Sequence, residues 1–168
     1  MKKLLAVLMI AGLTLVLTVP LSVFAQEKLH VERSIGIDAP IDKVWALMGD
    51  FTDMSWNPMI VKTELTAGEA TVPGAVRVLT LEDGSQISET LVSFQPEENV
   101  YTYTITESQL PISEHQGKIS TTSQDGITIV NWEASYVTDN AADADTVAQT
   151  IQELFEKGLQ GLKVTAEQ

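Results

Sequence analysis

The end of the sequence constrains the fold most, because a long amphipathic helix follows a series of strands joined by tight turns. Over residues 146–163, apolar residues recur at spacings of three and four, which predicts a helix with one apolar face. That face consists of Val147, Ile151, Leu154, Phe155, Gly158, Leu159 and Leu162. Such a helix is roughly 27 Å long, close to the width of a sheet of about six strands. It can cover a curved sheet but cannot fill the space beneath it, so we expect a cavity between them.

The preceding strands are predicted to form an antiparallel meander. Asp83-Gly84 and Asp125-Gly126 are strong signals for tight turns between extended segments. Because short turns join antiparallel neighbours, successive strands should lie side by side. The strands are expected at residues 30–37, 59–65, 75–81, 86–94, 100–106, 116–122 and 127–137.

Two short helices are expected after the first strand. Asp38 is suited to cap a helix and Pro40 to occupy its first turn, and Gly49-Asp50 should end it. Residues 51–56 predict a second short helix before Asn57-Pro58. The fold class is therefore α+β, with a curved antiparallel sheet, a long C-terminal helix and two short helices.

Residues 1–25 are typical of an export signal. Lys2 and Lys3 precede an apolar run over residues 4–23, and Val23-Phe24-Ala25 offers a cleavage site before Gln26. An uncleaved membrane anchor is the alternative, since about 20 apolar residues can span a bilayer. Pro20 and the lack of a charged residue directly after Ala25 favour cleavage. We therefore expect a single periplasmic domain over residues 26–168.

Composition excludes several classes of function. The chain has 10 Lys and Arg against 23 Asp and Glu, a formal net charge of −13; without Lys2 and Lys3, 8 basic residues remain and the charge is −15. Such a surface repels phosphate backbones, so nucleic-acid binding is not expected. It keeps the protein soluble or favours a basic protein partner. The sequence has no cysteine, which excludes disulfides, thiol nucleophiles, cysteine metal sites and a lipidated cysteine anchor, so no membrane attachment is expected after cleavage.

Alternation along two strands assigns bulky side chains to the face beneath the helix. The inward set comprises Tyr101, Tyr103 and Ile105 from one strand and Val130, Trp132, Ala134 and Tyr136 from another. Buried Tyr and Trp side chains usually bond their polar ends to a partner. Several such ends in one interior indicate either a hydrogen-bonded core or a ligand pocket, and the residues alone leave both open.

Three further residues have two interpretations each. If Ile87 and Leu91 face inward, so does Glu89, and a buried carboxylate needs a partner, water or ligand; otherwise Glu89 lies on a solvated face. His115 is either a core or rim histidine or a ligand contact. Gly158 costs about 1 kcal/mol relative to alanine within a helix. Either close helix–sheet contact or room for a ligand explains that glycine.

Several short motifs occur in an order that resembles a known family. They are Asp38-Ala39-Pro40-Ile41-Asp42-Lys43-Val44-Trp45, Asp50-Phe51, Trp56-Asn57-Pro58, Ile87-Ser88-Glu89-Thr90-Leu91, Leu110-Pro111, Val130-Asn131-Trp132-Glu133 and Phe155-Glu156-Lys157-Gly158-Leu159. Their order resembles the polyketide cyclase/dehydrase-like branch of the START/Bet v 1 (SRPBCC) superfamily. With the export signal, the chain is most similar to periplasmic MxaD-like proteins associated with methanol oxidation. The resemblance implies a helix-grip fold, in which a curved antiparallel sheet wraps around the C-terminal helix with a cavity between them.

The resemblance also implies that Glu89, Tyr103, Ile105, His115 and Ala134 line this cavity. With the inward-facing residues and the helix, the candidate ligand-binding set is Glu89, Tyr101, Tyr103, Ile105, His115, Trp132, Ala134, Tyr136, Phe155 and Gly158. His115 stands where relatives frequently carry an aromatic residue, and Ala134 where some carry a polar one. The ligand of a relative therefore cannot be transferred to this chain.

Three functions fit this pattern. A mostly apolar cavity favours non-catalytic binding of a small hydrophobic or aromatic molecule. An acidic surface favours the second, an MxaD-like accessory role in docking on a basic periplasmic dehydrogenase or cytochrome. The third is a cyclase or dehydratase, for which Glu89, His115, Tyr101 and Tyr103 could supply acid and base. No cofactor or metal is expected, because the two histidines have no paired spacing.

Overall fold

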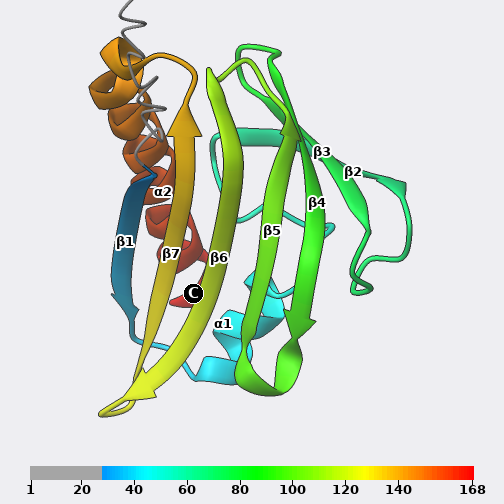
Figure 1. The fold of residues 1–168 in the computed structure, drawn as a ribbon. Helices are drawn as coiled ribbons and strands as arrows, with labels where there is room; N and C mark the ends of the chain where they lie inside the picture. The colour runs from blue at the N-terminus through cyan, green and yellow to red at the C-terminus, as the bar shows by residue number, and fades with distance from the viewer. Residues whose placement is uncertain (1–27) are drawn as a thin grey trace, which may run out of the picture.

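The computed structural model describes residues 28–168, which form a seven-stranded antiparallel sheet and two α-helices (Figure 1). The strands are β1 (Leu29–Ile37), β2 (Ile60–Ala67), β3 (Val76–Leu81), β4 (Gln86–Gln95), β5 (Val100–Glu107), β6 (Ile112–Gln124) and β7 (Ile127–Thr138). The helices are α1 (Ile41–Met48) and α2 (Ala144–Ala166), with single 3₁₀ turns at η1 (Pro96–Glu98) and η2 (Ala141–Asp143). In the strand order β1-β7-β6-β5-β4-β3-β2, strands β2 to β7 form the predicted meander, and the helix-grip architecture is confirmed. Strand β1 pairs with β7 and not with its successor β2, which lies at the opposite edge. The predicted export signal lies outside the described residues.

Helix α2 lies on the concave side of the sheet and packs mainly against β1, at one edge (Figure 1). Its buried residues are Val147, Ile151, Phe155, Gly158, Leu159, Leu162 and Ala166. From β1, Arg33 donates to Glu156 and Gln152 of α2, each at 2.7 Å. This position leaves the opposite half of the concave face, under β3 and β4, to be covered by other parts of the chain. No helix within residues 28–168 is long and apolar enough to cross a membrane.

The second predicted short helix, at residues 51–56, is wrong, because this segment forms a series of turns. Side chains in the segment and directly before it bond to nearby backbone and so replace helical hydrogen bonds. Asp50 Oδ1 accepts from the backbone N–H of Thr52, and Asp53 Oδ1 accepts from that of Ser55, each at 2.8 Å. Short polar side chains commonly compete with helices in this way.

The start of α1 also differs from the prediction. The helix begins after Pro40, which occupies the N-cap position, and no side chain caps it. Asp38 instead donates its backbone N–H to Glu167 at the end of α2, at 2.9 Å. Val44 and Met48 are buried, and Trp45 is half-buried.

Aromatic side chains fill much of the space between α2 and the sheet. The ring of Trp132 on β7 stacks on Phe155 of α2, with centroids 4.3 Å apart, and contacts Trp56 edge-on at 5.6 Å. Phe51, from the turn segment, contacts Tyr101 of β5 at 6.0 Å. The interior is therefore more completely packed than the shapes of one helix and one sheet led us to expect.

Candidate ligand-binding site

A small, largely enclosed cavity remains between α2 and the middle of the sheet. Its volume is about 30 Å³. Six of the ten predicted site residues line it: Glu89, Tyr103, Ile105, His115, Trp132 and Phe155. A volume of this size holds one or two waters but no complete organic ligand.

A larger groove of about 270 Å³ lies immediately outside this cavity. It runs between α2, the β3–β4 turn and the segment joining β5 to β6. Four apolar side chains, Ile87, Leu110, Ile151 and Leu154, line both the groove and the cavity. They form the partition between the two spaces, so a shift of these side chains would join the groove to the cavity.

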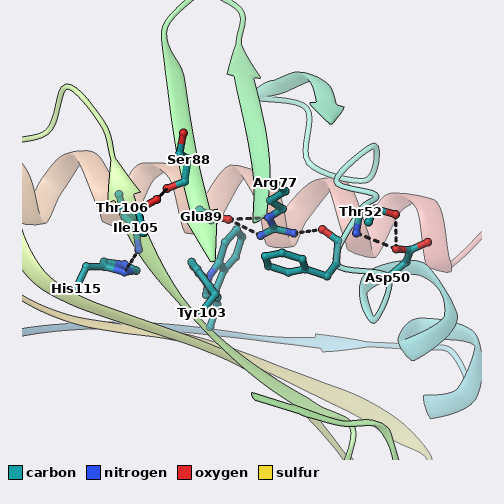
Figure 2. Close-up of polar contacts among 11 residues, drawn as sticks. Asp50, Thr52, Arg77, Ser88, Glu89, Tyr103, Ile105, Thr106 and His115 are labelled. Atoms are coloured by element: carbon teal, nitrogen blue, oxygen red, sulfur yellow. Dashed lines mark hydrogen bonds and ion pairs between the residues drawn. The ribbon is translucent and has the colours of Figure 1, made fainter. Parts of the chain in front are cut away.

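A buried ion pair between Arg77 and Glu89 adjoins the cavity, which Glu89 lines (Figure 2). Glu89 faces inward and is 5 % exposed, and its Oε2 lies 2.7 Å from Nε and 2.6 Å from Nη2 of Arg77. Arg77 is fully buried, donates from Nη1 to the carbonyl of Phe51 at 2.7 Å, and lies over the Phe51 ring at 4.1 Å. A guanidinium with these partners is well suited to hold a buried carboxylate.

Arg77 is the principal site residue that the sequence analysis missed. A signal was present, because Arg77 alternates with Ala75 and Leu79, both of which are buried. This alternation places Arg77 on the inner face of β3, directly opposite Glu89 on β4. The partner that a buried Glu89 requires is therefore the neighbouring cross-strand residue.

Burial dominates the electrostatics of this pair. It raises the pKa of Glu89, and the positive charge of Arg77 opposes that rise. Burial alone would lower the pKa of Arg77, but the Glu89 carboxylate leaves it above its usual value. Arg77 therefore keeps its proton, and Glu89 holds a proton more readily than an exposed carboxyl does.

His115 reaches the cavity through an irregularity in β6. The register between β6 and β7 shifts between Ser113 and Gln116, and Glu114 has a φ of 50°. His115 is 7 % exposed, and its Nδ1 accepts a hydrogen bond from the backbone N–H of Ile105 at 3.1 Å (Figure 2). Burial, with a smaller effect of the Lys28 charge, lowers the pKa of His115 to about 4. The ring is neutral near pH 7, and its proton lies on Nε2.

Tyr103 lines the cavity between His115 and the Arg77–Glu89 pair (Figure 2). Its hydroxyl accepts a hydrogen bond from Trp132 Nε1 at 2.8 Å. The ring lies over Gly117 of β6, where a Cβ would come within 2.3 Å of it, so glycine is required there. Burial, reinforced by the charge of Glu89, raises the pKa of Tyr103 well above its usual value, and the phenol stays protonated.

A sequence-family comparison agrees with this architecture. The family described as polyketide cyclase/dehydrase and lipid transport matches residues 28–167. The chain belongs to this family. No curated protein sequence matched the chain.

Solved structures support the same assignment. An uncharacterized protein from Bacillus thuringiensis superposes with a TM-score of 0.74 at 25% identity, over 83% of this chain and 100% of its own. The protein XoxI from Bacillus cereus gives 0.73 at 26% identity, over 82% and 94%. Ara h 8.0201, at 18% identity, gives 0.69 over 83% and 98% and shares the fold. The cavity described above therefore lies within a polyketide cyclase/dehydrase-family domain of the Bet v 1-like type.

Four predicted site residues lie outside the cavity lining of this family domain. Tyr101, Ala134 and Tyr136 are buried in the core beyond it. Gly158 faces Trp132 and Asn57, and a Cβ there would lie 2.8 Å from an atom of each. The glycine is thus explained by close helix–sheet contact and not by room for a ligand.

Asn57 is a second residue that the sequence analysis did not assign to the site. It is fully buried, lines the cavity, and its Oδ1 accepts from the backbone N–H of Met59 at 3.0 Å. Its Nδ2 donor has no hydrogen-bond partner among the described residues. Its position in the Trp56-Asn57-Pro58 motif was visible in the sequence, but its inward orientation depends on the turn.

A possible metal-ligand group lies on the outer face of the sheet, away from the cavity. Within residues 28–168, His30, Glu32 and Glu133 place ligand atoms within 4.8 Å of one another. Lys118 pairs with Glu133 at 2.7 Å, and Asn131 donates to Glu32 at 3.2 Å. Because protein partners already occupy both carboxylates, we assign no metal to this group.

Proposed function

We propose that the protein binds a small hydrophobic or aromatic molecule in the groove and cavity between α2 and the sheet. The observation that carries this proposal is the shared lining, because Ile87, Leu110, Ile151 and Leu154 line both the groove and the cavity. The groove alone approaches the lower end of the size range of small-molecule sites, about 300 Å³. The family description, which includes lipid transport, supports an apolar ligand.

We further propose that binding occurs without catalysis. General acid–base chemistry is most efficient when the pKa of the catalytic group is near the working pH. His115 has a pKa of about 4, far from neutral pH. Burial raises the pKa of Glu89, but its carboxylate is held by Arg77 through two contacts. Both features support a binding role over the cyclase or dehydratase alternative.

A fluorescence titration tests the binding proposal. The neutral probe N-phenyl-1-naphthylamine should bind the parent protein with enhanced emission. Leu154→Trp fills the partition between groove and cavity and should raise the probe's Kd about tenfold or more. Val164→Trp is the matched control, because Val164 lies on the same helix with 62 % of its surface exposed, and it should leave the Kd unchanged. Equal affinities for the two variants, or no binding to the parent, would refute the proposal.

The periplasmic location is also a proposal, and it rests on residues 1–25. We expect cleavage after Ala25. Cell fractionation with N-terminal sequencing of the recovered protein tests this: a sequence beginning at Gln26 in the periplasmic fraction supports it. An intact N-terminus in the cytoplasm contradicts it.

The net charge of −13 supports a second role, which can coexist with ligand binding. We propose that the acidic surface docks on a basic periplasmic protein, such as a dehydrogenase or cytochrome, as the MxaD-like resemblance suggests. Attraction between exposed charges weakens as salt screens them, over about 8 Å at physiological ionic strength. Association with a purified candidate should therefore weaken between low and high salt. Association that does not depend on salt would contradict this role.

A further inference from the structure

Three polar groups around the cavity have unused hydrogen-bonding capacity. Asn57 Nδ2 is a buried donor without a partner. Both contacts of Glu89 with Arg77 use Oε2, so Oε1 has no hydrogen bond with any residue from 28 to 168. His115 accepts through Nδ1, so its Nε2–H is the donor left for other contacts. All three side chains line the same small space.

This combination requires a group that both accepts and donates hydrogen bonds. The two N–H donors need an acceptor, and the carboxylate oxygen needs a donor. Leaving any of them unpaired on ligand binding costs about 1–3 kcal/mol. A hydroxyl satisfies both requirements with a single oxygen, and a cavity of about 30 Å³ has room for such a group but for little more.

Charged groups fit this cavity less well. A ligand carboxylate would face the free oxygen of Glu89, and the positive charge of Arg77 is already paired with Glu89 and does not line the cavity. A ligand ammonium would face the N–H groups of Asn57 and His115. Ketones and ethers accept but cannot donate to Glu89.

We propose that the ligand is a neutral amphiphile with a terminal hydroxyl, an alcohol or phenol, whose hydroxyl enters the cavity. This inference rests on the proposed function, because it needs a ligand that passes the partition. The apolar body then lies in the groove, against the partition residues and Leu81, while the polar residues of the β3–β4 turn and α2 form the rim. Glu89 and Asn57 are thus residues that determine ligand specificity.

A competition experiment with ligands of equal chain length tests this selectivity. Octan-1-ol, methyl octyl ether, octanoate and octylammonium are each titrated against bound N-phenyl-1-naphthylamine. The Kd of octan-1-ol should be at least about tenfold lower than that of each of the other three. A tenfold difference in Kd corresponds to about one hydrogen bond. If the ether or octanoate binds as tightly as the alcohol, the hydroxyl proposal is wrong while the binding function stands. If the probe itself does not bind, the proposed function fails, and this inference fails with it.

Two variants connect the selectivity to named atoms. Arg77→Met combined with Glu89→Leu removes the acceptor without leaving a buried charge, and it should reduce the alcohol-to-ether affinity ratio to about one. Asn57→Asp keeps the acceptor that caps Met59 but replaces the Nδ2 donor by an oxygen, so octylammonium should gain about tenfold relative to octan-1-ol. Val164→Trp is the control and should keep the parent ratios. If both cavity variants keep the affinity ratios of the parent protein, the proposal is wrong.

Discussion

Arg77 and Glu89 stand directly opposite each other on β3 and β4, and their side chains form a buried ion pair on the inner face of the sheet, against Phe51. Within residues 28–168, neither side chain forms an ion pair with any other residue. A buried pair of this kind contributes little net stability compared with apolar residues, but it is costly to break. Its presence in the interior of a small domain is therefore better explained by specificity than by stability.

Removing one partner should strongly destabilise the fold. Arg77→Met leaves Glu89 buried without a counter-charge, and the free energy of unfolding should fall by about 3–5 kcal/mol. The double variant Arg77→Met/Glu89→Leu should recover most of this loss. Urea unfolding at neutral pH gives each value. A single variant as stable as the double variant would show that the pair is not desolvated as described.

The exposed pair on β2 provides the control for this experiment. Lys62 and Glu64 approach to 2.9 Å, but their side chains are 60 % and 46 % exposed. Surface pairs contribute about 0–1 kcal/mol, so Lys62→Met should change the unfolding free energy by less than about 1 kcal/mol.

The pH dependence of stability should show that His115 is buried in its neutral form. The unfolded side chain takes up a proton below its usual pKa of 6.5, whereas the folded one does so only below about 4. Between these values the unfolded state binds more protons, so the free energy of unfolding falls as pH decreases, by about 3 kcal/mol in total. His115→Gln should lose this part of the slope when urea unfolding is measured at about pH 7 and about pH 4.5.

Two comparisons isolate this effect. The raised pKa of Glu89 has the opposite effect on stability, because the folded state takes up this proton before the unfolded state as pH falls. Subtracting the His115→Gln data from the parent data removes the contribution of Glu89, since both proteins contain it. His30 is the other histidine in the chain and its side chain is 54% exposed, so His30→Gln should keep the parental slope. An identical slope for the parent and His115→Gln would contradict the buried, neutral state of His115.

The elements that rest on repeating apolar patterns could be predicted from the sequence. The strands and α2 follow repeating patterns of apolar residues that span many positions, and Asp83-Gly84 and Asp125-Gly126 determine two of the turns. The segment at residues 51–56 could not be predicted in this way, because Asp50 and Asp53 bind backbone groups only two residues away. Such local bonds leave the apolar pattern unchanged.

The site was predicted less completely, for a different physical reason. The inward orientation of Glu89 followed from alternation once a partner was assumed, but Arg77 becomes that partner only through the register of β3 against β4. His115 depends on the irregularity near Glu114, which shifts the alternation of β6. The small cavity volume depends on the rotamers of Trp132, Phe155 and their neighbours, and a sequence pattern does not contain them.

Close contact at Gly158 predicts that even a small side chain there is harmful. A Cβ would lie 2.8 Å from both the Trp132 ring and Asn57, so Gly158→Ala should destabilise the protein by about 1–3 kcal/mol despite the better helix propensity of alanine. Thermal unfolding measures the change. Gln160→Ala, at an exposed position of the same helix, should be neutral within about 0.5 kcal/mol. A neutral or stabilising effect of Gly158→Ala would show that helix and sheet can separate without cost, as a roomier interior would allow.

Two buried tyrosines differ in a way that a matched pair of variants can measure. Tyr103 accepts a hydrogen bond from Trp132 Nε1, whereas the hydroxyl of Tyr136 has no hydrogen-bond partner among the described residues. Tyr103→Phe leaves the indole N–H unpaired and should lower the free energy of unfolding by about 1–3 kcal/mol. Tyr136→Phe removes an unpaired polar group and should be neutral or stabilising, because a buried hydroxyl without a partner is itself destabilising. Urea unfolding followed by tryptophan fluorescence measures both variants, and equal losses would contradict the assigned Trp132–Tyr103 hydrogen bond.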